Sequence, residues 1–188
     1  MKNYRRDVVL KRPWFNNVEE DKKNIIETLF VKDKLIANQM KSLLLIPHKN
    51  CLTEINNYQS TLKDYSLKRL REEKYISLAP KSAPAFNDEK QSYIIITTNP
   101  IFPNETNTQF HDYDLKVYCM CQFDAWELDN FTERPLKMAG IVVGALNNSK
   151  MTGIGRTQWT GTTMLSVNDQ IGGYVSSFSI IQGGTDIR

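Results

Sequence analysis

The sequence has few of the residues from which reactive and metal-binding sites are built: its 188 residues include two histidines and three cysteines. Cys51, Cys119 and Cys121 are odd in number and cannot form a complete disulfide framework, so we interpret them as thiols in a reducing compartment. With two histidines in the chain, acid–base chemistry would have to rest on carboxylates. These shortages weigh against a metal centre and against a nucleophilic enzyme.

Long apolar runs and a strong charge of one sign are also missing. No run approaches the roughly 18 apolar residues that cross a bilayer, and no apolar stretch of signal-peptide type follows the first residues. Lysine and arginine total 24 against 21 aspartate and glutamate, and the net charge of +3 is small for a dedicated nucleic-acid-binding protein. The sequence therefore predicts a soluble protein made inside a cell, with no membrane contact.

The first 17 residues mix cations with apolar and aromatic side chains. Residues 1–12 contain five cations and one acid, so their net charge of +4 exceeds that of the whole chain. Because no helical or strand period is sustained, we predict an extended basic arm over residues 1–17. The residues that we expect to make its contacts are Arg5, Arg6, Lys11, Arg12, Trp14 and Phe15. The aromatic side chains need burial, so docking on a neighbouring subunit is favoured over binding to phosphates.

The first half of the remaining chain is predicted to be helical. Acidic residues at 19–21 suit a helix start, and apolar residues then recur at three- and four-residue spacing from Ile25 to Leu44, which predicts one helix or two nearly continuous helices from Val18 to before Pro47. A second helical stretch begins at Thr53, a residue that suits an N-cap. A loop rich in proline and alanine follows at residues 79–88.

The second half is predicted to be a β-sheet with one helix. Strands are expected at residues 93–98, at residues 115–123 and within residues 153–182, and the helix at about residues 131–147. Turn signals lie at Asn168-Asp169 and at Gly172-Gly173. The predicted fold class is α+β, in one domain over residues 18–188: helices over 18–75, then a mostly antiparallel or mixed sheet packed against one helix over 90–182.

One face of the predicted helix is expected to pack on the sheet. Its apolar stripe consists of Leu136, Ala139, Gly140, Val143 and Leu146. Asn130 or Thr132 would be the N-cap, and Pro135 is tolerated in the first turn. The small residues would keep the helix thin, which suits close packing on a sheet.

Two cysteines could form half of a metal site. Cys119 and Cys121 project from the same side of a strand, but Leu115, Val117 and Phe123 share that side, so the thiols fit a hydrophobic core better. The other candidate ligands are Cys51, His48 and His111, which make an incomplete set for zinc. We therefore predict no metal site.

Carboxylates gather around Trp126 in the sequence. They are Asp112, Asp114, Asp124, Glu127 and Asp129. They could include an acid–base pair, but a solvated acidic cluster explains them better. We predict no catalytic residue and no cofactor.

The order of elements over residues 90–182 resembles that of a phage protein family. It consists of a β-branched strand at residues 93–96, an alternating strand that ends in the segment from Cys121 to Trp126, a helix that starts Glu133-Arg134-Pro135, and glycine-bounded strands at 153–155 and 173–180. In this order the chain is similar to the tail-terminator and tail-completion proteins of tailed bacteriophages, in which an Arg-bearing helix start leads into an apolar helix on a sheet. The N-terminal part is longer than in that family, so the chain equally resembles a connector or ring protein of a short-tailed phage neck.

The resemblance implies an architectural role in a virion assembled in the host cytoplasm. It implies a homo-oligomeric ring of roughly six or twelve copies in the neck or head–tail connection. Connector or portal-side proteins and tail proteins would adjoin this ring, and DNA would pass through its lumen without sequence specificity. The loops at 99–112 and 147–172 would contact other rings or the lumen. A nucleic-acid-binding accessory protein that uses the basic arm is the alternative, and an enzyme with carboxylates around Trp126 comes third.

Overall fold

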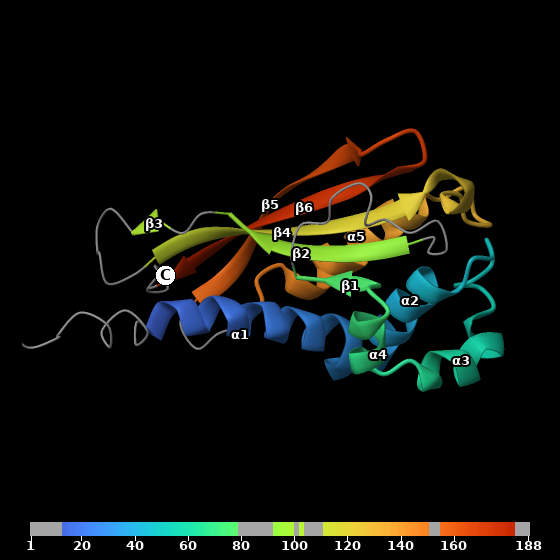
Figure 1. The fold of residues 1–188 in the computed structure, drawn as a ribbon, viewed down its shortest axis with the longest axis horizontal. Coiled ribbons are helices and arrows are strands. Elements are labelled where there is room, and N and C mark those ends of the chain that lie inside the picture. Colours follow the sequence, from blue (N-terminus) through green and yellow to red (C-terminus); the bar gives the residue numbers. More distant parts are fainter. Residues whose placement is uncertain (1–12, 79–91, 100–101, 104–110, 151–154, 183–188) are drawn as a thin grey trace, which may run out of the picture.

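The structure is a computed structural model that describes residues 13–78, 92–99, 102–103, 111–150 and 155–182. It has two layers, a β-sheet and a set of helices packed against one of its faces (Figure 1). The predicted α+β class is confirmed, with N-terminal helices followed by a mixed sheet that packs against one later helix.

The helices come mainly from the first half of the chain. They are α1 Pro13–Glu27, the π-helix η2 Thr28–Lys32, α2 Lys34–Leu45, the 3-10 helix η3 Ile55–Tyr58, α3 Gln59–Asp64, α4 Leu67–Glu72, the 3-10 helix η5 Phe123–Ala125 and α5 Arg134–Leu146. The predicted helical pattern up to Pro47 is thus divided at Asp33. The Asp33 carboxylate starts α2 by accepting hydrogen bonds from the backbone N–H of Leu35 at 2.7 Å and of Ile36 at 3.1 Å.

Two helix starts differ from the prediction. Helix α1 begins at Pro13, so residues 13–17 are helical and not part of an extended arm, because the fixed φ and missing N–H of proline suit the first helical position. Residues 1–12 lie outside the described residues. Thr53 does not cap a helix: its hydroxyl donates to Asp129 Oδ2 at 2.6 Å, and the next helix starts at Ile55.

The sheet runs in the order β1-β2-β4-β6-β5, and β3 pairs with β4 off this path. The strands are β1 Ile76–Ser77, β2 Ser92–Thr98, β3 Phe102–Pro103, β4 His111–Gln122, β5 Gly155–Ser166 and β6 Ile171–Gln182. Strands β1 and β2 are parallel, and the other pairs are antiparallel. Along the described path, β5 therefore lies at one edge and the two-residue β1 at the other.

The turn between β5 and β6 lies at the predicted Asn168-Asp169 signal. The Asn168 side-chain oxygen accepts hydrogen bonds from the N–H of Gln170 at 2.9 Å and of Ile171 at 2.8 Å. The predicted turn at Gly172-Gly173 is wrong, because both glycines lie inside β6. At Gly173 an added Cβ would lie 2.1 Å from the carbonyl oxygen of Cys119, so this glycine permits the close approach of β6 to β4.

The main core lies between the helices and one face of the sheet. Alternate residues of β4 enter it as predicted: Leu115, Val117 and Cys119 are completely buried. From the helices it receives Ile25, Leu29, Met40, Leu43, Met138 and Val142. Phe123 was expected on the same face but is 39% exposed, because β4 ends at Gln122 and the chain turns into η5.

Helix α5 is rotated relative to the predicted stripe. Its buried residues are Arg134, Pro135, Met138, Ala139, Val142 and Leu146. Leu136 is 46% exposed, and a Cβ added at Gly140 or Gly144 would have no atom of the described structure within 4 Å. These glycines therefore do not bring α5 close to the sheet. The orientation differs because Arg134, a charged residue, lies on the buried side of the helix.

Candidate docking surface

The segment from Trp126 to Glu133 is a closed loop between η5 and α5. Its backbone is joined across the loop by the Arg134 N–H to Trp126 carbonyl bond at 2.7 Å and the Leu128 N–H to Thr132 carbonyl bond at 2.9 Å. The Leu128 side chain is 3% exposed and anchors the loop in the core. The loop is thus a defined structure whose shape is set by its own hydrogen bonds.

The loop presents Phe131 to solvent. The side chain of Phe131 is 92% exposed, and its φ is +55°. This left-handed backbone conformation is unfavourable for a bulky residue by on the order of 1–2 kcal/mol, so other contacts of the loop must offset it. The exposed position of the Phe131 ring is therefore set by the surrounding fold.

The loop is fastened to the turn that follows α2. Lys49 Nζ lies 2.6 Å from Glu127 Oε2, and the Asp129 N–H donates to the Lys49 carbonyl at 3.1 Å. The Thr53 hydroxyl bonds the other acidic side chain, that of Asp129. Exposed ion pairs contribute little stability by themselves, but three contacts between the same two segments fix their relative position.

Arg134 supports the base of the loop from inside the protein. It is 1% exposed, and its guanidinium lies at the carboxyl end of α2. Each donor group reaches backbone carbonyls: Nε to Ala125 at 2.8 Å, Nη1 to Leu43 at 3.0 Å and Ile46 at 2.7 Å, and Nη2 to Pro47 at 3.0 Å and His48 at 3.0 Å. These bonds use all five N–H groups of an arginine.

The charge of Arg134 is matched by carbonyl dipoles. Within the described part of the chain, no ion pair includes this side chain. The last carbonyls of a helix carry partial negative charge and favour a cation. Arg134 therefore caps α2 and holds the loop, α5 and the turn after α2 in one arrangement.

Aromatic side chains continue the surface from the loop toward the sheet. The ring of Trp126 lies 5.2 Å from that of Phe123 and 6.3 Å from that of Tyr174, measured between centroids. The Tyr174 hydroxyl donates to Glu133 Oε2 at 2.6 Å, and this bond to a carboxylate raises the pKa of Tyr174. Glu133 is thus held beside the start of α5.

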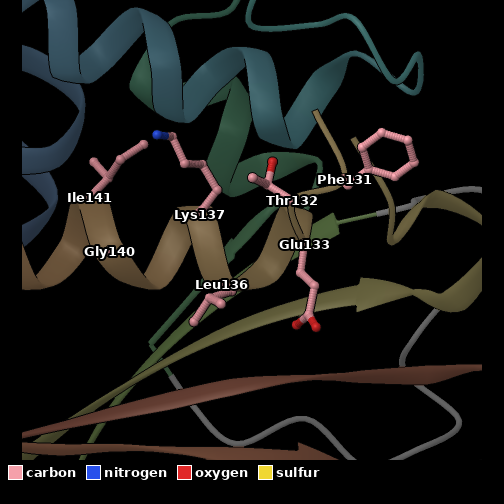
Figure 2. A pocket seen from close by; sticks show the side chains of 7 residues that line it. All are labelled: Phe131, Thr132, Glu133, Leu136, Lys137, Gly140 and Ile141. Carbon is pink, nitrogen blue, oxygen red and sulfur yellow. The ribbon is translucent and has the colours of Figure 1, made fainter. Parts of the chain in front are cut away.

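A groove of about 550 Å³ lies along the outer side of the helix start. Its lining residues are Phe131, Thr132, Glu133, Leu136, Lys137, Gly140 and Ile141 (Figure 2). Figure 2 shows Leu136 and Glu133 on the sheet side of α5, with Lys137 and Thr132 on the opposite side. The absent side chain at Gly140 leaves the helix backbone accessible. The groove suits an apolar side chain or a segment of a partner, with one acid and one base at its rim.

Two residues of the predicted acidic cluster, Glu127 and Asp129, hold this loop. Glu127 and Asp129 form the contacts to Lys49 and Thr53, and Asp124 is exposed nearby. Asp114 lies at the other end of β4, where it accepts a 3.4 Å hydrogen bond from Asn99. The side chain of Asp112 is outside the described residues. The structure therefore does not bring the five predicted carboxylates together around Trp126.

The predicted core role of Cys119 and Cys121 is confirmed, and Cys51 is buried as well. Cys51, Cys119 and Cys121 are all completely buried and free, and burial raises the thiol pKa of each. His48 stacks on Tyr58 with ring centroids 6.4 Å apart, and the side chain of His111 is outside the described residues. In the described residues, no group of three or more histidine, cysteine, aspartate or glutamate side chains could hold a metal ion.

Arg5, Arg6, Lys11 and Arg12 lie outside the described residues, and so do the side chains of Trp14 and Phe15, whose backbones are in α1. Sequence reasoning placed Arg134 only at a helix start and did not select Phe131. An arginine directly before a proline at the start of an apolar helix was the available signal for Arg134.

Comparison with known protein families identifies a match over most of the chain. The model of the YomW family matches residues 23–180, which include the loop, the groove and the whole described sheet up to Ile180. Its name is that of a Bacillus prophage protein, and the family is phage-associated. No curated protein matches the chain. None of the described helices has the length and apolar character needed to span a membrane.

Proposed function

The chain belongs to the YomW family, and we propose that it is a structural virion protein that forms a ring in the phage neck or head–tail connection. As a tail terminator or connector, it provides a conduit for DNA and a docking surface for the adjacent rings.

The observation that carries this proposal is Phe131. An aromatic ring 92% exposed on a strained, triply fastened loop is unfavourable for a protein that works alone. Rigid aromatic side chains beside a groove are typical anchors of protein–protein contacts, because little conformational freedom is lost on binding. A working state in which another protein of the particle covers Phe131 accounts for all of these features.

The charge distribution supports the ring and its conduit. Residues 1–12 carry +4, so the other 176 residues together carry −1. A nearly neutral body suits a lumen through which DNA slides, since a strongly basic one would bind the phosphates tightly. In this proposal the basic arm, residues 1–12, contacts a neighbouring copy. Closed rings are built from such head-to-tail contacts.

Native mass spectrometry of the full chain tests the ring. We expect a single closed oligomer with the same copy number at about 0.1 M and about 1 M salt, since exposed electrostatic contacts alone would be screened over this range. A monomer at every concentration and ionic strength contradicts the proposal.

A particle assay tests the docking surface. In cells that carry an induced prophage lacking its own copy of the gene, Phe131→Ser should lower the yield of complete particles about a hundredfold, which corresponds to a contact worth about 3 kcal/mol. Leu35→Ser is the matched control, because Leu35 is 66% exposed at the opposite end of α2. Equal yields from the two variants would remove Phe131 as the anchor.

A nucleic-acid-binding accessory protein is the second candidate, favoured by the basic residues 1–12. It predicts a monomer whose affinity for DNA falls steeply with salt and depends on those residues. Fluorescence anisotropy with a labelled duplex, measured on the full chain at several salt concentrations, separates it from the ring.

A further inference from the structure

The two edges of the sheet differ in how they are protected from further pairing. Strand β1 contains two residues, whereas β5 contains 12 and pairs on one side with β6. In the described part of the chain no strand pairs with the other side of β5. Short edge strands are one of the usual means by which proteins prevent unwanted pairing, and β5 lacks it.

The sequence of β5 also lacks the charges that protect an edge. No charged residue occurs between Arg156 and Asp169, and the run Thr162-Thr163-Met164-Leu165-Ser166 favours a strand. Met164 is 58% exposed and Leu165 is 36% exposed. A register shift between Trp159 and Gly161 interrupts the first part of the edge, so the regular pairing surface is the run that follows it.

We infer that this edge receives the N-terminal segment of a second copy of the chain as an added antiparallel strand. The inference rests on the proposed ring, because it names the contact by which one copy holds the next. Residues 1–12, which precede α1, include Val8-Val9-Leu10, whose side chains suit a strand. Backbone hydrogen bonds would supply affinity, and Met164 and Leu165 would be covered from the side.

Charge complementarity sets the direction of the added strand. Asp124 and Asp169 are exposed at the end of the sheet where β5 finishes, and the Phe123 N–H to Gln170 carbonyl bond at 2.9 Å joins their two segments. With Val8-Val9-Leu10 beside the regular run, an antiparallel strand brings Arg5 and Arg6 toward these acids. A parallel strand would direct the same two arginines toward Arg156 instead.

A second copy is the occupant because of where α1 begins. Figure 1 shows the start of α1 at the lower left of the molecule, while β5 ends at the top. The segment that precedes Pro13 therefore starts on the far side of its own molecule from the regular part of β5. In a ring, the same segment of the neighbouring copy can reach that edge, and the effective concentration of linked copies strengthens the contact.

A cross-link tests the pairing in the full chain. Val9→Cys with Met164→Cys should form a disulfide under mild oxidation, whereas Val9→Cys with Val31→Cys should not, because Val31 is exposed elsewhere. The three natural cysteines are buried and do not compete. Mixing isotope-labelled and unlabelled chains and sequencing the linked peptides should show links between copies. Links confined within one chain, or equal linking in the control, would overturn the inference.

Charged substitutions separate this contact from the ring itself. Met164→Lys with Leu165→Lys should lower the oligomer fraction at least about tenfold in native mass spectrometry, while the circular dichroism spectrum of the folded chain is unchanged. Leu35→Lys is the control and should leave the oligomer intact. A ring that persists in the double variant overturns the strand addition and leaves the proposed function standing. A wild-type chain that is monomeric under all conditions overturns both.

Discussion

Helices α1 and α5 are both attached to the rest of the protein through a buried charged side chain, but the two attachments differ in completeness. Arg134 of α5 is 1% exposed and its five N–H groups all reach carbonyl oxygens. Asp21 of α1 is also 1% exposed, and its Oδ2 accepts a hydrogen bond from the Tyr113 hydroxyl of β4. Among the described residues its Oδ1 has no partner.

The two buried charges differ in how completely hydrogen bonds offset their loss of hydration. A buried charge is tolerated when its desolvation is offset by bonds to every polar atom. Asp21 falls short, and burial, with a smaller effect of Glu20, raises its pKa from about 3.8 to about 6. The contribution of Arg134 to stability should therefore be the same at all ordinary pH values. The contribution of Asp21 should be greatest in acid.

The largest effect is expected from removing the complete attachment. Arg134→Leu leaves five carbonyls without their donor and should lower the free energy of unfolding by about 3–5 kcal/mol. Denaturant unfolding measures this loss. Arg71→Leu, at an exposed arginine of α4, is the matched control and should change stability by less than about 0.5 kcal/mol.

Arg134→Lys is the companion variant, because it keeps the charge with three donors in place of five. We expect an intermediate loss of about 2 kcal/mol. If it equals the wild type, the cation alone holds α5, and the hydrogen bonds are not the cause.

The incomplete attachment predicts a pH dependence. Because the pKa of Asp21 is higher in the folded chain than its ordinary value near 3.8, the folded state holds this proton over a range in which the unfolded state releases it. The stabilisation is complete below about pH 4 and is lost as the pH rises through about 6, by up to about 3 kcal/mol. Unfolding measured from pH 4 to pH 7.5 should show this fall, and Asp21→Asn should remove most of it.

A smaller effect is expected from the partner of Asp21. Tyr113→Phe removes the hydroxyl that bonds the buried carboxylate and should lower stability at pH 7 by about 1–2 kcal/mol. It should also raise the pKa of Asp21 further, so the pH at which stability falls moves upward. An unchanged pH profile would mean that the hydroxyl does not stabilise the charged form.

The smallest effect concerns the body of α5. Gly140→Ala and Gly144→Ala should each raise stability by about 0.5–1 kcal/mol, because alanine favours the helix and space is open at both positions. Thermal unfolding of each variant would measure this gain. A loss of stability would show that space at these two positions is not open and that other groups cover the outer face of α5.

The sequence predicted the elements better than their orientation. Alternation in β4 and the three- and four-residue spacing in α1 and α2 are local signals, and these elements are present, although α1 starts five residues earlier than predicted. The orientation of α5 could not be read in this way, because a pattern based on hydropathy places Arg134 in solvent. Four of the five carbonyls that make its burial favourable come from residues 43–48, far away in the chain.

The candidate site was predicted only in part. The acidic residues near Trp126 were recognised, but their contacts that fix the loop are made to Lys49 and Thr53. No local sequence pattern connects these two residues to the acids. Phe131 could not be selected because exposure and a positive φ are properties of the folded loop. Gly173 was mistaken for a turn residue because the approach of β4, which requires a glycine there, leaves no mark in the neighbouring sequence.

The position of β6 between β4 and β5 also has a consequence for the nascent chain. Strand β4 ends at Gln122 and can pair with β2 as soon as both have been made, but its neighbour β6 begins only at Ile171. At synthesis rates of about 5–20 residues per second, the intervening residues take several seconds to make. During that time one edge of the central strand has unpaired backbone N–H and C=O groups, so it is most open to mispairing while the protein is still on the ribosome.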